Sequence, residues 1–227
     1  MNVILLCGGK GLRLRPITED IPKPMANLNG KPILYYILDH LKNFEIKKVT
    51  VSIGYKANKI KNYLLLSNFP LEIETSNAGD VDIIKRIVNV TKYLNEDFIV
   101  LYGDTISNVN LNDLKNFHFS HDKPVTMSVW PFKLQFGVVS IDENSFVTNF
   151  NEKPKNNILI NIGYFYFSSE MINKLEDFDT FEQFLIYIAN EKKLAAYQHN
   201  GEHVTVNSIQ ELEEAERYLA SREITSE

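Results

Sequence analysis

Three glycines and four cationic side chains lie within the first 25 residues of this chain. The glycines form the turn Gly8-Gly9-Lys10-Gly11, where a backbone without side chains can bring its N–H groups close to a ligand. The cations are Lys10, Arg13, Arg15 and Lys23. Backbone N–H groups and fixed cations after a strand are how proteins hold a polyphosphate. The alternative is an ordinary glycine turn beside solvated charges.

The residues around the turn predict how it is held in place. Val3 to Cys7 is a short apolar run, as expected of a parallel strand buried on both faces. Cys7, the only cysteine, is expected to pack inertly in that strand. Pro16, Pro22 and Pro24 forbid a continuous helix, so the cations are predicted to lie on a long loop. The turn lacks the GxxxxGK[ST] of a P-loop and the third glycine of a dinucleotide fingerprint.

A second group of residues that could do chemistry is Tyr102-Gly103-Asp104. It follows the buried strand predicted over Phe98 to Tyr102, and in open α/β sheets ligands lie beyond the carboxyl ends of the strands. An acid there is well placed for Mg²⁺, which prefers one or two carboxylates plus phosphate oxygens and water. Asp104 could equally cap the loop that follows it, and the residues alone leave both readings open.

Alternating strands and helices predict an α/β fold with a mostly parallel sheet. Further strands are expected over Lys48 to Ile53 and Leu71 to Thr75, and helices over Pro32 to Asn43, Tyr55 to Leu66 and Val81 to Tyr93. After Lys123 the pattern becomes rich in β-structure, with strands expected over Val125 to Trp130, Gly137 to Ile141, Phe146 to Phe150 and Ile160 to Phe167. Two closing helices begin with capping-box patterns, Asp179 with Glu182 and Ser208 with Glu211.

Composition favours a protein with small anionic ligands over one that binds polymers. The formal charge of −5 over 227 residues argues against a nucleic-acid or anionic-membrane surface. No signal peptide or membrane span is evident, so the cytoplasm is the expected compartment. The five histidines show no metal or triad spacing. Residues 1–227 are expected to form one domain.

The full N-terminal string, NVILLCGGKGLRLRPITEDIPKPM, resembles the signature of the sugar-1-phosphate nucleotidylyltransferases, GGxG(T/S)RLxPLTxxxPKPM. Three more segments resemble that family in the same order: Phe136 to Val139, Glu152 to Pro154 and Asn161 to Gly163. The resemblance implies a Rossmann-like three-layer nucleotidyltransferase domain with a mainly parallel central sheet and a β-rich sugar-binding part. It also implies the substrates, a nucleoside triphosphate and a sugar 1-phosphate.

The resemblance assigns roles to residues of this chain. Nucleotide-binding positions are Cys7, Gly8, Gly9, Gly11, Arg13, Lys23, Gly79, Asp80, Tyr102 and Gly103. Sugar-phosphate-binding positions are Gly137, Glu152, Lys153 and Asn161. Asp104 and Asn207 are the implied Mg²⁺ ligands, and Arg13 and Lys23 the implied catalytic residues.

Within the family, the chain most resembles cytidylyltransferases acting on glucose 1-phosphate, which favours CTP. This closer resemblance rests on three segments: Gly54 to Lys56 with Ile60-Lys61, Gly79-Asp80 before Ile84-Lys85-Arg86, and Leu194 to Gly201. For Lys85-Arg86 the alternative is a solvated helix face.

The chain also departs from the family pattern. Leu12 replaces the usual Thr or Ser, and Asn207 replaces the usual second metal-binding Asp. The Gly79-Asp80 segment is shorter than in cytidylyltransferases, which weakens the prediction of the base. These departures leave two alternatives open: a non-catalytic regulatory homologue, or transfer to a phosphorylated acceptor that is not a sugar. The subunit count, a homo-oligomer included, also stays open.

Overall fold

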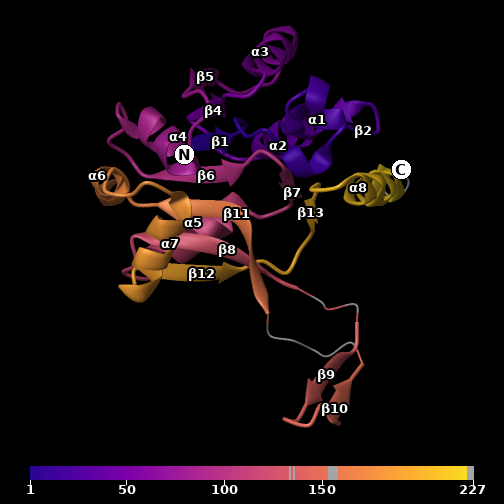
Figure 1. Ribbon diagram of the computed structural model, residues 1–227. Helices are drawn as coiled ribbons and strands as arrows, with labels where there is room; N and C mark the ends of the chain where they lie inside the picture. Colours follow the sequence, from indigo (N-terminus) through magenta and orange to yellow (C-terminus); the bar gives the residue numbers. More distant parts are fainter. Residues whose placement is uncertain (133, 135, 153–157, 224–227) are drawn as a thin grey trace.

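A seven-stranded sheet lies at the centre of the computed structural model (Figure 1). The structure describes residues 1–132, 134, 136–152 and 158–223. In spatial order the strands are β12 (Leu194–Gln198), β8 (Val125–Pro131), β11 (Leu159–Phe167), β6 (Phe98–Tyr102), β1 (Asn2–Leu6), β4 (Lys48–Ile53) and β5 (Ile73–Asn77). β11 runs antiparallel to both of its neighbours, and the other neighbouring pairs are parallel. The predicted mainly parallel α/β sheet is confirmed.

Helices cover both faces of this sheet, because alternate residues of its strands point to opposite sides. In β1, Val3 and Leu5 join one apolar core and Ile4 joins the other. The first core is completed by α2 (Ile33–Leu41), α3 (Ala57–Leu66), α5 (Leu111–Phe119) and α8 (Ile209–Glu223). The second is completed by α4 (Ile83–Thr91), α6 (Ile172–Leu175) and α7 (Phe181–Asn190). The three-layer arrangement therefore follows from the strand periodicity.

The segment of cations between β1 and α2 is more ordered than the expected long loop. It holds a 3₁₀ turn η1 (Leu12–Leu14), the short helix α1 (Ile17–Asp20) and a second 3₁₀ turn η2 (Lys23–Met25). Proline prevents a long helix but is tolerated where a short one begins, and Pro16 and Pro24 occupy such positions. Each cation is thus attached to a turn of defined shape.

Short strand pairs complete the chain. β2 (Asn27–Leu28) pairs with β3 (Lys31–Pro32), and the 3₁₀ turn η3 (Ser169–Met171) precedes α6. β7 (Thr105–Ser107) pairs with β13 (His203–Thr205), so that Thr105 lies opposite Thr205. This last pairing joins the segment after Asp104 to the segment before Asn207.

One of the two predicted helix caps is wrong. α7 is capped by the Thr180 hydroxyl, which accepts from the Gln183 N–H at 3.2 Å, and not by Asp179. At α8 the Ser208 hydroxyl accepts from the Glu211 N–H at 3.2 Å, as predicted. The Glu211 carboxylate, however, reaches back one residue further than a capping box requires, to the N–H of Asn207.

The hairpin of β9 (Val138–Ile141) and β10 (Val147–Asn151) stands apart from the sheet (Figure 1). All of its strand residues are exposed, including the aromatic ring of Phe150. The sequence predicted both strands correctly. Their residues did not indicate that the side chains of both strands would be exposed.

Among the helices that the structure describes, none combines the length and the apolar composition that crossing a bilayer requires.

His118 lies on the buried side of α5, where its ring nitrogens hydrogen-bond with the hydroxyls of Thr126 and Ser168. Burial lowers the pKa of His118 from 6.5 to about 4. Between these pH values the unfolded chain binds more protons than the folded one, so stability falls as pH falls through this window. We expect His118 to reduce the free energy of unfolding by about 2 kcal/mol at pH 5 relative to pH 7.5.

Urea denaturation of the wild type and of His118→Gln at both pH values measures this contribution. The variant should lose less stability on acidification than the wild type. Equal losses in the two proteins would exclude His118 as a source of acid sensitivity.

Candidate active site

A pocket of about 680 Å³ opens at the carboxyl ends of β1 and β6. Its volume lies within the range of small-molecule sites. The predicted residues that line it are Cys7, Gly8, Gly9, Gly11, Arg13, Lys23, Asp80, Tyr102, Gly103, Asp104 and Asn207. Leu12 also lines it, at the position where the family signature has a hydroxyl. The fold therefore brings together most of the nucleotide and metal positions that the sequence indicated.

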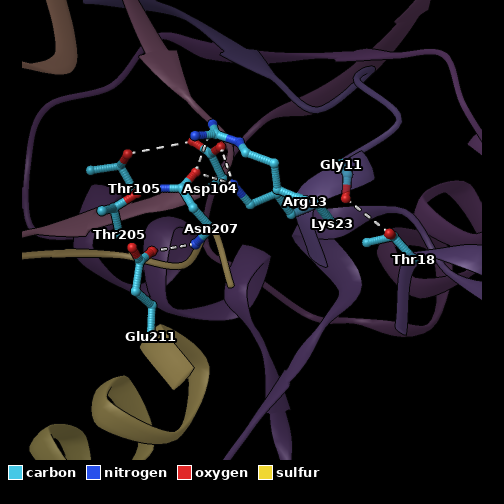
Figure 2. Close-up of polar contacts among 9 residues, drawn as sticks. All are labelled: Gly11, Arg13, Thr18, Lys23, Asp104, Thr105, Thr205, Asn207 and Glu211. Atoms are coloured by element: carbon cyan, nitrogen blue, oxygen red, sulfur yellow. Dashed lines mark hydrogen bonds and ion pairs between the residues drawn. The ribbon is translucent and has the colours of Figure 1, made fainter. Parts of the chain in front are cut away.

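The glycine turn meets the cationic segment at Gly11. Gly11 has φ +61°, in the left-handed region, and a Cβ there would lie 2.9 Å from the Cβ of Lys23. The Thr18 hydroxyl donates to the Gly11 carbonyl at 2.9 Å (Figure 2). Only glycine fits this conformation and this contact, so the turn and Lys23 hold each other in position.

Lys23 is the central cation of the site. Its Nζ donates to Asp104 Oδ2 at 2.6 Å and to Asn207 Oδ1 at 2.9 Å (Figure 2). The side chain of Lys23 is 9% exposed and that of Asp104 is 32% exposed. A lysine ammonium fixed at the base of a pocket is well placed to contact phosphate oxygens.

Four hydrogen bonds orient Asn207, including the one from Lys23. Its backbone N–H donates to Glu211 Oε2 at 2.6 Å, and its Nδ2 donates to Thr205 Oγ1 at 3.1 Å (Figure 2). Oδ1 consequently points toward the cations, where Arg13 Nη2 also donates to it at 3.0 Å. The sequence did not assign Glu211 to the site, although its capping-box spacing was visible.

The same oxygens can serve a divalent cation. Asp104 and Asn207 each direct an oxygen at one positively charged atom, the Lys23 Nζ. Mg²⁺ takes oxygen ligands and is commonly held by one or two side chains, with phosphate and water completing its shell. The donor set thus fits Mg²⁺ with one carboxylate and one amide. Within the described residues, no group of three or more His, Cys, Asp or Glu side chains offers another site.

Neither Cys7 nor Tyr102 can exchange protons at neutral pH. Burial raises the pKa of the Cys7 thiol well above its ordinary value, and the Asp104 carboxylate raises it further. Burial also raises the pKa of Tyr102 to about 12. Both side chains therefore stay neutral and contribute shape to the pocket. The predicted inert role of Cys7 agrees with its burial within the first core.

Two further predicted residues lie beside the pocket. Gly79 precedes Asp80 and has φ +74°. Asn161 hydrogen-bonds with the Tyr102 side chain and accepts from the Gly163 N–H at 2.8 Å. Asp80 itself forms a salt bridge with Lys10. Asn161 therefore contacts Tyr102, which forms part of the pocket wall, and does not line the pocket itself.

Two further sugar-phosphate positions, Gly137 and Glu152, do not line the pocket. Gly137 and Glu152 lie at the base of the β9–β10 hairpin, where a Cβ on Gly137 would contact Phe150 and Glu152. Lys153 lies outside the described residues. The sugar-phosphate roles of these three residues stay predictions from the resemblance.

Arg86 is a charged pocket residue to which the sequence analysis assigned no role in the site. The alternative of a solvated helix face is wrong for it, since Arg86 is only 4% exposed and lines the pocket. Its neighbour Lys85 donates to the Phe178 carbonyl at 2.9 Å and does not line the pocket. Ile84 and Ile87, on either side of Arg86 in the sequence, are also buried residues of α4. This apolar pair was the sequence feature that could have indicated the burial of Arg86.

Comparison with known proteins finds relatives along most of the chain. The chain is 35% identical to the D-glycero-alpha-D-manno-heptose 1-phosphate guanylyltransferase of Campylobacter jejuni, over 86% of this chain and 89% of the relative. It is 30% identical to the glucose-1-phosphate cytidylyltransferase of Salmonella typhi, over 88% of this chain and 89% of the relative.

Among solved structures, HddC from Yersinia pseudotuberculosis is similar with a TM-score of 0.73 and 25% identity. The similarity covers 96% of this chain and 99% of HddC. The sequence also matches the nucleotidyl transferase family over residues 2–210, which include every residue of the pocket. The chain belongs to the nucleotidyl transferase family.

Proposed function

We propose that this protein transfers a nucleoside monophosphate from a nucleoside triphosphate to a sugar 1-phosphate, releasing pyrophosphate. The observation that carries the proposal is Lys23, whose Nζ is held by Asp104 and Asn207 beside the glycine turn. The activities for which the two relatives are named support the same reaction class, since both act on a sugar 1-phosphate.

In this mechanism an oxygen of the sugar 1-phosphate attacks the α-phosphorus of the triphosphate in line. A new P–O bond forms, and the bond from the α-phosphorus to the pyrophosphate oxygen breaks. The attacking oxygen is already ionised at neutral pH, so no side chain has to remove a proton. Catalysis then consists of positioning and charge neutralisation.

Each pocket residue has a place in that scheme. The backbone of Gly8 to Gly11 cradles the phosphates, and Arg13 neutralises the departing pyrophosphate. Lys23 bridges the α-phosphate and the attacking phosphate. Asp104 and Asn207 would hold Mg²⁺, which would neutralise phosphate charge when bound. Lys153 is assigned to the sugar phosphate by resemblance alone.

The nucleobase and the sugar are narrower proposals. We favour CTP and glucose 1-phosphate because the segments around Arg86 and Leu194 resemble the cytidylyltransferases. The two relatives carry different bases and sugars in their names, which makes GTP with a heptose 1-phosphate the competing pair.

Pyrophosphate release tests the proposal directly. CTP, UTP, GTP, dTTP and ATP are each incubated with Mg²⁺ and a panel of sugar 1-phosphates that includes glucose, mannose and heptose. Release with one triphosphate and one sugar phosphate is the expected result. Folded protein that binds a triphosphate and releases no pyrophosphate with any sugar would overturn the proposal. A second panel of phosphorylated alcohols then separates another acceptor from a non-catalytic homologue.

Asn207→Asp is expected to tighten metal binding, because a second carboxylate adds a negative ligand for Mg²⁺. The Mg²⁺ concentration that gives half-maximal activity should fall by about tenfold. Mn²⁺ binding to the substrate-free protein, followed by electron paramagnetic resonance, should tighten in parallel. The control is Asn200→Asp, which adds the same charge at an exposed position. Unchanged Mn²⁺ affinity in Asn207→Asp would remove residue 207 from the metal site.

A further inference from the structure

A buried guanidinium lies beneath the glycine turn. Arg86 Nη2 donates to the Gly8 carbonyl at 3.1 Å, and its Nη1 donates to the Ile53 carbonyl at 3.3 Å. Gly8 follows the end of β1 and Ile53 is the last residue of β4. One side chain from α4 therefore ties together the carboxyl ends of two neighbouring strands at the floor of the pocket.

Two glycines leave the space that this guanidinium occupies. A Cβ on Gly8 would lie 1.8 Å from Arg86 Nη1, and one on Gly54 would lie 2.6 Å from the same atom. Neither position can carry a side chain while Arg86 lies there. Gly8 is thus required by a contact inside the protein.

The charge of Arg86 is only partly compensated. In the part of the chain that the structure describes, no carboxylate forms a salt bridge with it, and two carbonyl oxygens are its hydrogen-bond acceptors. Asp80 and Asp82 act on it only as more distant charges. Burying a cation is costly unless an anion accompanies it, and a guanidinium stays protonated at neutral pH. A pocket lined by such a cation favours an anionic ligand.

We propose that Arg86 is a positioning residue for the triphosphate. It holds the Gly8 carbonyl, and with it the backbone from Gly9 to Gly11, in the arrangement that receives the phosphates. It also places a permanent positive charge under them. This inference rests on the proposed function, because it requires that the pocket bind a nucleoside triphosphate.

The first test is binding of inorganic pyrophosphate with Mg²⁺, measured by calorimetry. Pyrophosphate carries no base, so it reports on the phosphate site alone. Arg86→Met removes both the charge and the donors, and should weaken binding by about tenfold or more. Arg86→Lys keeps the charge but loses the bidentate donor geometry of the guanidinium. Its affinity for pyrophosphate should lie between the affinities of Arg86→Met and the wild type. The control is Lys85→Met, a neighbouring cation of α4 outside the pocket, which should bind within about twofold of the wild type.

The second test separates positioning from a general loss of structure. In Arg86→Lys, the KM for the triphosphate should rise about tenfold, while the KM for the sugar phosphate stays unchanged. A purely structural role would lower the active fraction and leave both KM values alone, which would overturn the inference. Folded Arg86→Met that binds pyrophosphate as tightly as the wild type would overturn it as well. If Arg86→Met does not fold, Arg86→Lys decides both tests.

The outcomes also distinguish this inference from the proposed function. A wild type that transfers nucleotide normally, with Arg86 variants that behave like it, overturns the inference alone. A wild type that binds neither pyrophosphate nor any triphosphate overturns both.

Discussion

Replacing Lys23 by Ala is expected to lower kcat by about 10²–10³-fold while the protein stays folded. Lys23 is the cation nearest to both proposed metal ligands, so its removal takes away charge stabilisation where the attacking and leaving groups meet. The fold should tolerate the change, because the Asp104 side chain is 32% exposed and stays hydrated without its partner. Pyrophosphate release under saturating substrates measures the loss, and circular dichroism measures the fold.

The matched control for this experiment is Lys42→Ala. Lys42 forms a salt bridge with Asp39 at the end of α2, so the variant also removes a lysine from a salt bridge, but Lys42 does not line the pocket. It should keep full activity. A folded Lys23→Ala protein with normal turnover would eliminate the assigned mechanism, since no other described lysine contacts both Asp104 and Asn207.

Replacing Asp104 by Asn is expected to reduce activity by a similar factor and to abolish most of the response to Mg²⁺. Asn207 already provides an amide, so the variant has two neutral ligands and no carboxylate for the metal. The shape of the site is kept, because Asn and Asp have nearly equal size. Activity is measured as a function of Mg²⁺ concentration, and half-saturation should move beyond about ten times its wild-type value.

Asp39→Asn serves as the control for this second variant, because it removes a surface carboxylate that is paired with a lysine. Its Mg²⁺ dependence should match that of the wild type. Asp104 would lose its role as a metal ligand if Asp104→Asn kept the wild-type half-saturation. In that case Asp104 would act only as the hydrogen-bond acceptor for Lys23. The double variant Asp104→Asn with Lys23→Ala would then have the same activity as Lys23→Ala alone.

Several features of the site were predictable because they depend on neighbours in the sequence. The buried strand before the glycine turn, and the acid after Phe98 to Tyr102, both follow from short apolar runs that end in glycine. Parallel strands place their carboxyl ends at one edge of a sheet, so Gly8 and Asp104 were expected at the same edge. The pairing of β1 with β6 in the structure makes them neighbours there. The Ser208 cap of α8 was likewise readable from spacing.

Other features were set by segments that are far apart in the chain. Asn207 contacts Lys23 across 184 positions because β13 pairs with β7, and neither of these short strands has a distinctive pattern. The strands β9 and β10 were recognisable in the sequence, yet the side chains of both are exposed. The local sequence pattern of a strand does not show whether another part of the protein packs against it.

The sequence by itself determined the alternation of main-sheet strands and helices from β1 to β6, the glycine turn and the identity of the cations, because each depends on residue type and short spacing. It did not indicate helix α5 or the edge strand β12. Tertiary structure alone decided the environment of Arg86. Its burial requires that Gly8 and Gly54, from two different strand ends, both lack a side chain where α4 packs. The sequence of a helix does not reveal which residues pack against it. The burial of the Arg86 charge beneath the pocket could therefore be found only from the tertiary structure.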